Sequence, residues 1–392
     1  MGKNATYLIT GGAGFIGSNF VRHLYAIDDK ASVRVLDKLT YSGNLENLKE
    51  FEGRLGFEFI KGDICDQKTV QAAMQGVEVV INFAAESAVD RSIDDPQSFI
   101  KTDIFGVYTL LEEARRNPSL KRFIQISTDE VYGHILEGSF KETSELKPRN
   151  PYAASKLGGE RLAYSFFETY QLPVVITRAS NNYGPYCYPE KVVPLFITNL
   201  ADGLQVPVYG EGRQVRDWLY VEDHCRAILL LVDTGVNGEV YNIGGGQECE
   251  NIELTCKLVA MMGKNEHSIK YVQDRPGHDM RYSLDSSKLK NLGWRPRVDL
   301  EDGLRKTVEW YLKNEQWWRP LKAKLDPRYA KGFWGKWTKR RKMIEAIAIE
   351  NSMIPCPNVI GARTSMPCPA CLRLDSRLTQ KLKTPENKCP EI

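Results

Sequence analysis

The sequence contains no long run of apolar residues. Of its 392 residues, 42% are hydrophobic, but no apolar segment approaches the roughly 20 residues that a bilayer-spanning helix needs. The first candidate strand, residues 6–9, begins almost at the start of the chain and leaves no room for a signal peptide. We therefore expect a cytoplasmic protein without a membrane partner.

A regular cysteine framework is missing as well. The chain has nine cysteines, and the first five show no framework spacing: Cys65, Cys187, Cys225, Cys249 and Cys256. Scattered cysteines of this kind are typical of reduced thiols in a cytoplasmic enzyme. The other four, Cys356, Cys368, Cys371 and Cys389, match no compact zinc-ligand spacing. No metal site is predicted.

A strong charge of one sign is also absent, since the formal net charge is +3. This balance argues against a nucleic-acid partner. The charge is nevertheless unevenly placed. Residues 323–392 hold 14 Lys and Arg against 6 Asp and Glu, an excess of eight that leaves −5 for the preceding part. We predict that residues 323–392 form a basic, Pro- and Cys-containing tail that is disordered.

What the sequence does contain is a glycine-rich turn near its start. Gly11, Gly14 and Gly17 follow the strand at residues 6–9 and open a predicted helix over residues 15–26. Glycine at these positions permits a tight turn and lets the backbone approach a pyrophosphate, which the helix N-terminus attracts. The turn predicts a dinucleotide site because it lies between a strand and a helix.

The next strand, residues 33–36, ends at Asp37, 20 residues beyond Gly17. A carboxylate at that place accepts hydrogen bonds from the adenosine ribose and repels a 2′-phosphate, so NAD is predicted rather than NADP. Apolar runs at residues 57–60, 78–83, 123–126 and 174–177 are further candidate strands, and a long helix is predicted at 96–116.

Near-continuous apolar runs that alternate with helices predict an α/β fold, a Rossmann-like doubly wound parallel sheet. We assign residues 1–180 to an NAD-binding domain, to which later segments could return. Beyond residue 180 the alternation weakens and Pro and Gly accumulate. Residues 181–322 are therefore predicted to form mainly a smaller substrate-binding lobe.

The segment from residue 127 to 156 holds the candidate chemistry. The strand at 123–126 delivers Thr128, Asp129 and Glu130 to its carboxyl end, where ligands bind in open α/β sheets. Tyr152 and Lys156 share one helix face, one turn apart. An ammonium there should lower the tyrosine pKa, so that Tyr152 could remove a proton from a sugar hydroxyl.

Several motifs together resemble the extended short-chain dehydrogenase/reductase superfamily and, within it, the dTDP-glucose 4,6-dehydratases. They are Gly-Gly-Ala-Gly-Phe-Ile-Gly at 11–17, Ser-Thr-Asp-Glu-Val-Tyr-Gly at 127–133, Asn-Asn-Tyr-Gly-Pro-Tyr at 181–186, Arg-Asp-Trp at 216–218 and Asp-Arg-Pro-Gly-His at 274–278. The resemblance covers residues 5–322. It implies a homodimeric lyase that oxidises dTDP-glucose at C4, eliminates water across C5–C6 and returns the hydride to C6, giving dTDP-4-keto-6-deoxyglucose.

The same resemblance implies a role for each residue. Tyr152, helped by Lys156 and Thr128, takes the C4 hydroxyl proton while hydride passes to NAD⁺. Glu130 then removes the C5 proton and Asp129 protonates the departing C6 hydroxyl. The implied NAD contacts are Gly11, Gly14, Phe15, Ile16, Gly17, Asp37, Lys38, Leu39, Thr40, Asp63, Ile64, Phe83, Ala84, Ala85, Glu86, Thr102, Tyr152, Lys156 and Asn182. The implied substrate contacts are Ser87, Thr128, Asn181, Lys191, Val192, Pro207, Val208, Tyr209, Arg216, Asn242, Asp274, Arg275, Pro276, Gly277 and His278.

Two positions depart from the family pattern. Ala88 stands where the family usually has His, and Cys187 where a larger polar residue is usual. The base and sugar therefore stay open, with UDP-glucose as an alternative substrate. A 4-epimerase or decarboxylase of the superfamily would use Tyr152 and Lys156 but would not need Asp129 and Glu130. A non-catalytic NAD-sensing protein would need none of these side chains.

Overall fold

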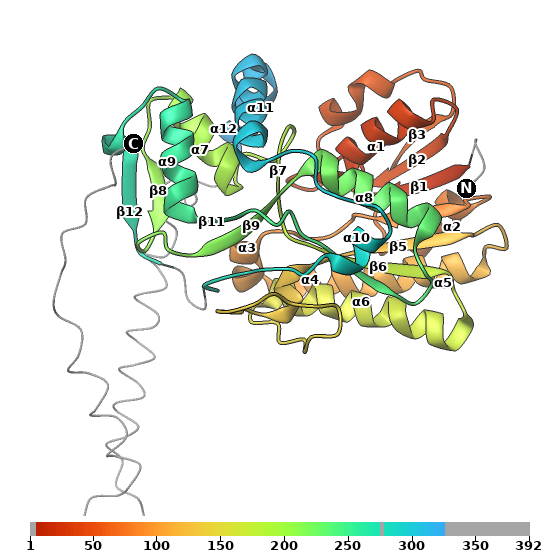
Figure 1. Ribbon diagram of the computed structural model, residues 1–392. Coiled ribbons are helices and arrows are strands. Elements are labelled where there is room, and N and C mark those ends of the chain that lie inside the picture. Colours follow the sequence, from red (N-terminus) through yellow and green to blue (C-terminus); the bar gives the residue numbers. More distant parts are fainter. Residues whose placement is uncertain (1–4, 275–277, 326–392) are drawn as a thin grey trace, which may run out of the picture. The chain divides into compact units, whose positions relative to one another are not determined.

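The computed structural model describes residues 5–274 and 278–325 (Figure 1). The substrate contacts predicted at Arg275, Pro276 and Gly277, and the predicted tail from residue 326 onward, lie outside the described residues. Within the described part of the chain, no helix has the length and apolar character needed to cross a membrane.

The central element is a seven-stranded sheet in the order β10-β6-β5-β4-β1-β2-β3, with every pair parallel. Its strands are β1 (Thr6–Thr10), β2 (Ser32–Asp37), β3 (Phe57–Lys61), β4 (Val79–Asn82), β5 (Arg122–Thr128), β6 (Val174–Ala179) and β10 (Val240–Ile243). The strand order reverses between β1 and β4, which leaves a crevice at the strands' carboxyl ends. The predicted doubly wound parallel sheet is confirmed.

Helices cover both faces of this sheet because its strands are apolar on both sides. In β1, Leu8 and Ile9 point to opposite faces, and both are fully buried. Leu8 belongs to the core with α2 (Gln67–Met74), α5 (Val107–Arg116) and α6 (Pro151–Tyr170). Ile9 belongs to the core with α1 (Phe15–Ile27) and α8 (Val221–Thr234), on the other side of the sheet (Figure 1).

The long helix predicted at 96–116 is not uniform. It consists of α4 (Pro96–Ile100), a π-helical segment η2 (Lys101–Gly106) and α5. The wider π turn lies against α6, where Gly159 leaves no side chain in the way: a Cβ on Gly159 would lie 2.2 Å from the carbonyl oxygen of Asp103. Short helical segments elsewhere are η1 (Leu45–Phe51), α3 (Val89–Asp94), η3 (Asp129–Tyr132), η4 (Glu266–Ser268) and α10 (Ser287–Asn291).

A smaller lobe forms a third core beside the sheet (Figure 1). It contains a three-stranded sheet of β7 (Asn181–Tyr183), β9 (Val215–Tyr220) and β11 (Glu248–Glu250), and a pair of β8 (Val206–Tyr209) with β12 (Ile269–Val272). Its helices are α7 (Val192–Ala201), α9 (Asn251–Met261), α11 (Leu300–Lys313) and α12 (Glu315–Ala323). The chain also returns from this region to the large sheet, since β10 pairs with β6 and α8 packs on the β1 side.

Candidate active site

A cavity of about 490 Å³ opens at the carboxyl ends of the parallel strands. It is lined by residues from the loops after β1, β2, β4, β5 and β6, and by residues of the smaller lobe. The site residues that we predicted, and that the structure describes, all line this cavity except Leu39, Asn242 and Asp274. Residues from both halves of the chain thus share one site, large enough for two linked ligands.

The glycine-rich turn has the shape that a pyrophosphate needs. Gly11 has φ +66, and a Cβ there would lie 2.6 Å from the backbone nitrogen of Ala84. A Cβ on Gly17 would lie 2.5 Å from the carbonyl oxygen of Gly11. Helix α1 starts after Gly14 without a side-chain cap. Its first-turn amides and its dipole are therefore available to an anion, and the turn fits a dinucleotide.

Asp37 is held by the backbone around it. Its carboxylate accepts hydrogen bonds from the amide of Ala13 at 3.0 Å and from the amide of Leu39 at 2.8 Å. Leu39, which does not line the cavity, therefore orients the carboxylate that does. Lys38 is paired with Asp63 at 2.7 Å, so its charge is partly neutralised by a neighbour in the cavity. These features fit a ribose with free hydroxyls better than a 2′-phosphate.

The catalytic candidates meet where β5 ends. The Thr128 hydroxyl donates to Asp129 Oδ1 at 3.1 Å and accepts a hydrogen bond from the Glu130 amide at 3.3 Å. Thr128 also shares a hydrogen bond with Tyr152. Asn150 caps α6 through the amide of Ala153 and donates to Glu130 Oε2 at 2.9 Å. The strand end and the Tyr-Lys helix therefore form one hydrogen-bonded centre.

Asp129 has the properties of a general acid. It is 3% exposed, and burial followed by the charge of Glu130 raises its pKa well above the usual range. A carboxyl group with a raised pKa keeps its proton to higher pH than an exposed one and can deliver it to a leaving hydroxyl. The second carboxyl group, Glu130, is less buried and is bonded to an amide donor, Asn150. The two neighbouring carboxyl groups thus differ in environment, which is what one acid and one base require.

The predicted lowering of the Tyr152 pKa by Lys156 is wrong for the protein described here. Burial, and then the charges of Glu130 and Asp103, raise the pKa of Tyr152 well above 10. Lys156 is itself buried, and burial lowers the pKa of its ammonium. The spacing of the two residues was predicted correctly, but spacing does not reveal the desolvation and the carboxylates around them.

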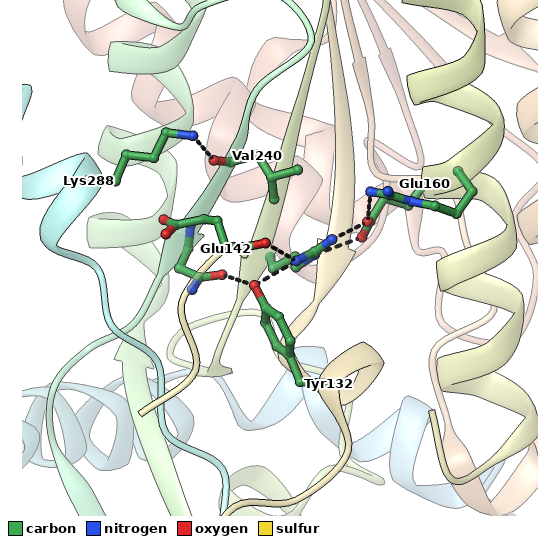
Figure 2. A network of polar contacts seen from close by, with 8 residues as sticks. Tyr132, Glu142, Glu160, Val240 and Lys288 are labelled. Carbon is green, nitrogen blue, oxygen red and sulfur yellow. Dashed lines mark hydrogen bonds and ion pairs between the residues drawn. The ribbon is translucent and has the colours of Figure 1, made fainter. Parts of the chain in front are cut away.

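Asn242, predicted to bind substrate, lies behind the site. It accepts a hydrogen bond from the Tyr132 hydroxyl at 2.8 Å and donates to the carbonyl of Phe140 at 2.9 Å. Arg178 donates to the same Tyr132 oxygen at 2.7 Å and to Glu160 at 3.0 Å, a buried network that Figure 2 follows from Glu160 to Tyr132. Because Tyr132 ends the turn that carries Asp129 and Glu130, the network holds that turn at its last residue.

At the lobe end, cationic side chains line the cavity. Arg216 is 5% exposed, stacks over the Tyr282 ring at 4.3 Å and donates to the carbonyl of Asp279 at 2.9 Å. Asp274 lies just outside the cavity and binds His278 Nδ1 at 2.6 Å, which orients that imidazole at the wall. A guanidinium and an imidazole in this place suit a second phosphate-bearing ligand.

Several residues of the site could not be predicted from the sequence. His224 lines the cavity and hydrogen-bonds Asn182 at 2.9 Å, and burial lowers its pKa to about 3, which keeps the imidazole neutral. Tyr282 also lines the cavity. Both lie in unremarkable stretches, and only the fold brings them to the site. Ala88 and Cys187, the two departures from the family pattern, line the cavity as well.

A parallel sheet with a glycine-rich βα turn, joined to a Thr-Tyr-Lys centre at its fifth strand, defines a short-chain dehydrogenase/reductase of the extended class. Residues 8–307 match the family described as GDP-mannose 4,6 dehydratase. The chain is 52% identical over 321 residues to a dTDP-glucose 4,6-dehydratase of Streptomyces niveus, covering 81% of this chain and 95% of that protein. The chain belongs to the dTDP-glucose 4,6-dehydratase family.

Solved structures agree with this assignment. DesIV, a dTDP-glucose 4,6-dehydratase from Streptomyces venezuelae crystallised with NAD and TYD bound, is 48% identical, with a TM-score of 0.79 over 81% of this chain and 99% of that chain. A UDP-glucose 4-epimerase from Thermus thermophilus, in complex with NAD, is 32% identical, with a TM-score of 0.73 over 79% of this chain and 99% of that chain. The fold is therefore shared with an epimerase.

Proposed function

We propose that this protein dehydrates dTDP-glucose to dTDP-4-keto-6-deoxyglucose, with NAD as its cofactor. One observation carries the proposal. A buried Asp129 with a raised pKa lies beside Glu130, in the same cavity as Thr128, Tyr152 and Lys156. Oxidation alone needs the last three residues, whereas loss of water also needs a proton donor and a base. The name of the Streptomyces niveus relative agrees with this activity.

The residues divide the work. NAD, held by the glycine-rich turn and Asp37, supplies the acceptor and later the donor of the hydride. Tyr152 in its ionised form, hydrogen-bonded to Thr128, takes the proton of the C4 hydroxyl, and Lys156 lies one turn further along the same helix. Glu130 takes the proton at C5, and Asp129 gives its proton to the oxygen that leaves C6. The proton acceptor at C4, Tyr152, and the proton donor at C6, Asp129, are both hydrogen-bonded to Thr128.

The substrate's diphosphate would bind at the lobe end of the cavity. Arg216 offers a buried cation there, and His278 is oriented by Asp274. Lys191, which also lines the cavity, donates to the carbonyl of Ser87 at 2.6 Å and adds a second cation beside the loop after β4. We further propose that Arg275, Pro276 and Gly277, which follow Asp274 in the sequence, contact the substrate. In this view residues 1–180, with α8 and β10, hold NAD, and residues 181–322 hold mainly the nucleotide sugar.

A related 4,6-dehydratase that acts on UDP-glucose is the second candidate. Ala88 and Cys187 both line the cavity, and both are smaller than the usual family residues. Small side chains there alter the space around the sugar and base, so the nucleobase preference needs its own measurement. A 4-epimerase is less well supported because epimerisation does not require the acid and base that Asp129 and Glu130 provide.

We further propose that the enzyme works in the cytoplasm as a homodimer. The five cysteines in the described part of the chain are all free thiols, which agrees with a reducing compartment. Ile100, Phe105 and Tyr108 are 54%, 51% and 43% exposed on consecutive helical segments. Exposed apolar side chains on these segments suit a contact with a second copy of the chain.

The test is to incubate the purified protein with dTDP-glucose and, separately, with UDP-glucose. The 4-keto product is read from its ultraviolet absorbance in alkali, and free NADH from the absorbance at 340 nm. We expect 4-keto product from dTDP-glucose without net accumulation of NADH, because the hydride returns to C6. Steady NADH accumulation would indicate a simple dehydrogenase, and formation of the C4 epimer would indicate the epimerase activity.

A further inference from the structure

Asp103 is a buried carboxylate behind the Tyr-Lys helix that the proposed chemistry does not yet use. Its side chain is 2% exposed. One oxygen accepts a hydrogen bond from the Ser155 hydroxyl at 2.7 Å, and the other accepts from the backbone amide of Glu86 at 3.0 Å. Ser155 precedes Lys156 in α6, and Glu86 lines the cavity. A single carboxylate therefore joins the catalytic helix to the loop after β4.

The backbone allows this close approach at a particular place. Asp103 lies in the π-helical segment η2, and two glycines of α6 face it. A Cβ on Gly159 would lie 2.2 Å from the Asp103 carbonyl oxygen, and a Cβ on Gly158 would lie 2.7 Å from Cδ1 of Ile104. Without side chains at these two positions, η2 comes near enough for the carboxylate to reach Ser155. Local π turns of this kind are frequent at functional sites.

The Asp103 carboxylate acts electrostatically on Lys156. Burial favours loss of the Lys156 proton, whereas the charge of Asp103 and then that of Glu160 favour keeping it. Glu160 is already paired with Arg178 at 2.5 Å and with Arg161 at 2.6 Å. The two hydrogen bonds that Asp103 accepts come from neutral donors. Asp103 is thus the carboxylate whose charge remains for the buried ammonium.

Building on the proposed function, we propose that Asp103 is a positioning residue whose carboxylate keeps the Lys156 ammonium charged beside Tyr152. It also fixes α6 through Ser155. Tyr152 experiences the charges of Glu130 and Asp129 in addition to that of Asp103. Glu86, which is hydrogen-bonded to Asp103 through its amide, is affected by the charges of Asp103, Arg91, Lys38 and Asp95.

The effect should depend on pH in a defined way. Burial raises the pKa of Asp103 to about 6, while Lys156 and Ser155 oppose the rise. The negative charge is therefore present above about pH 6 and absent below it. Below that pH, the unchanged protein should behave as if Asp103 were an amide. Removing the negative charge should also move the alkaline limb of the pH–rate profile to lower pH, because it lowers the pKa of Lys156.

The first experiment compares D103N with the matched control S155A, in which the charge remains but the hydroxyl is lost. The NAD-loaded protein is mixed rapidly with dTDP-glucose, and C4 oxidation is followed at 340 nm between pH 5.5 and 8.5. We expect D103N to be close to the parent rate at pH 5.5 and about tenfold slower at pH 8, since one pKa unit corresponds to tenfold. S155A keeps the carboxylate, so at pH 8 it should be slowed less than D103N. A D103N loss that does not vary with pH, or no loss at pH 8, would overturn the proposal.

A second measurement does not need turnover. In the holoenzyme labelled with ¹³C at the aspartate carboxyl groups, Asp103 should give a signal with a midpoint near pH 6 that D103N lacks. S155A removes a hydrogen bond to the ionised form, so it should move that midpoint to higher pH and assign the signal even if D103N folds poorly. If no such signal exists, the proposal fails although the enzyme may make product. If the signal exists but no 4-keto sugar forms, the proposed function fails and the role of Asp103 as a buried charge stands.

Discussion

Asn150 donates a hydrogen bond to Glu130 at 2.9 Å, and the same side chain accepts one from the Ala153 amide at 2.8 Å. It therefore caps the helix that carries Tyr152 and at the same time holds the carboxylate proposed to take the C5 proton. This amide thus links the helix of the residues for oxidation to a residue for elimination, in addition to the link through Thr128. Its two functions can be separated by substitution.

Asn150→Ser is expected to preserve the helix cap and to release Glu130. Serine is a good N-cap residue, so the melting temperature should stay close to the parent value. Its hydroxyl is too short to replace the amide donor at Glu130, so exchange of the C5 hydrogen with deuterated solvent should slow. Asn150→Ala is the control, and it should also lose about 1 kcal/mol of unfolding free energy. Parent-like exchange in Asn150→Ser would show that the contact with Glu130 is dispensable.

Asp129→Asn is expected to leave oxidation at C4 intact and to slow the loss of water. The buried acid has a raised pKa and can give up a proton, whereas an amide cannot. General-acid help is typically worth about 10²–10⁴-fold in rate. Bound NADH should therefore accumulate, which is measured by stopped-flow absorbance at 340 nm after mixing with dTDP-glucose.

Glu130→Gln is the matched comparison for that experiment. It should also slow dehydration, but unlike Asp129→Asn it should reduce exchange of the C5 hydrogen with deuterated solvent, which is read by NMR. Dehydration at near-parent rates in both variants would refute the elimination mechanism. An epimerase-like use of Tyr152 and Lys156 would then be the better explanation.

Much of the fold could be predicted because its signals are local. The strand at 123–126 appears as part of β5, and the helix predicted over residues 15–26 is α1. Short apolar runs and glycine turns carry this information without reference to distant residues. The position of β10 at the edge of the large sheet could not be predicted from local sequence, because it depends on the pairing of β10 with β6.

In the site, too, features with a local sequence signal were predicted and features that depend on packing were not. The glycine turn and the Thr-Asp-Glu and Tyr-Lys groups have fixed spacings, and the structure brings them to one cavity. Asn242 carries no spacing that distinguishes a ligand contact from a buried support, and packing decides between the two. The raised pKa of Tyr152 likewise depends on burial and on Asp103, which lies about fifty residues away in sequence.

Glu86→Gln is expected to change how stability depends on pH. Burial and then Asp103 raise the Glu86 pKa to about 7, with Arg91 and Lys38 opposing. Because the folded pKa exceeds the unfolded one, Glu86 favours the folded state most below about pH 4.5, and this contribution is lost as the pH rises through 7. The loss is at most about 3 kcal/mol, and less because the side chain is partly exposed.

The check is the melting temperature of cofactor-free protein between pH 5 and 8. The parent protein should lose stability relative to Glu86→Gln over this range, because glutamine remains neutral. Glu137→Gln removes an exposed carboxyl group and controls for the change in net charge. A constant difference between Glu86→Gln and the parent across the range would contradict the raised pKa.

The last prediction concerns the end of the chain. A chain of residues 1–327 keeps α12, whose Trp317 donates to Asn47 at 2.8 Å while Asn47 donates to the carbonyl of Ala13 at 2.9 Å. Ala13 lies in the glycine-rich turn, so α12 supports the cofactor site from outside. We expect residues 1–327 to fold, bind NAD and turn over like the whole chain, as measured by bound NAD per chain and by 4-keto product.

A chain of residues 1–314 is the matched control, because it lacks α12 and the buried Trp318. It should lose NAD on gel filtration and melt at a lower temperature. Trp317→Phe isolates the hydrogen bond within the aromatic cluster: phenylalanine preserves most of the packing against Trp310 but cannot donate to Asn47. Loss of that bond should cost about 1 kcal/mol and loosen NAD binding. If residues 1–327 bind NAD but lose most of their turnover, the segment beyond residue 327 has a catalytic role and this prediction is wrong.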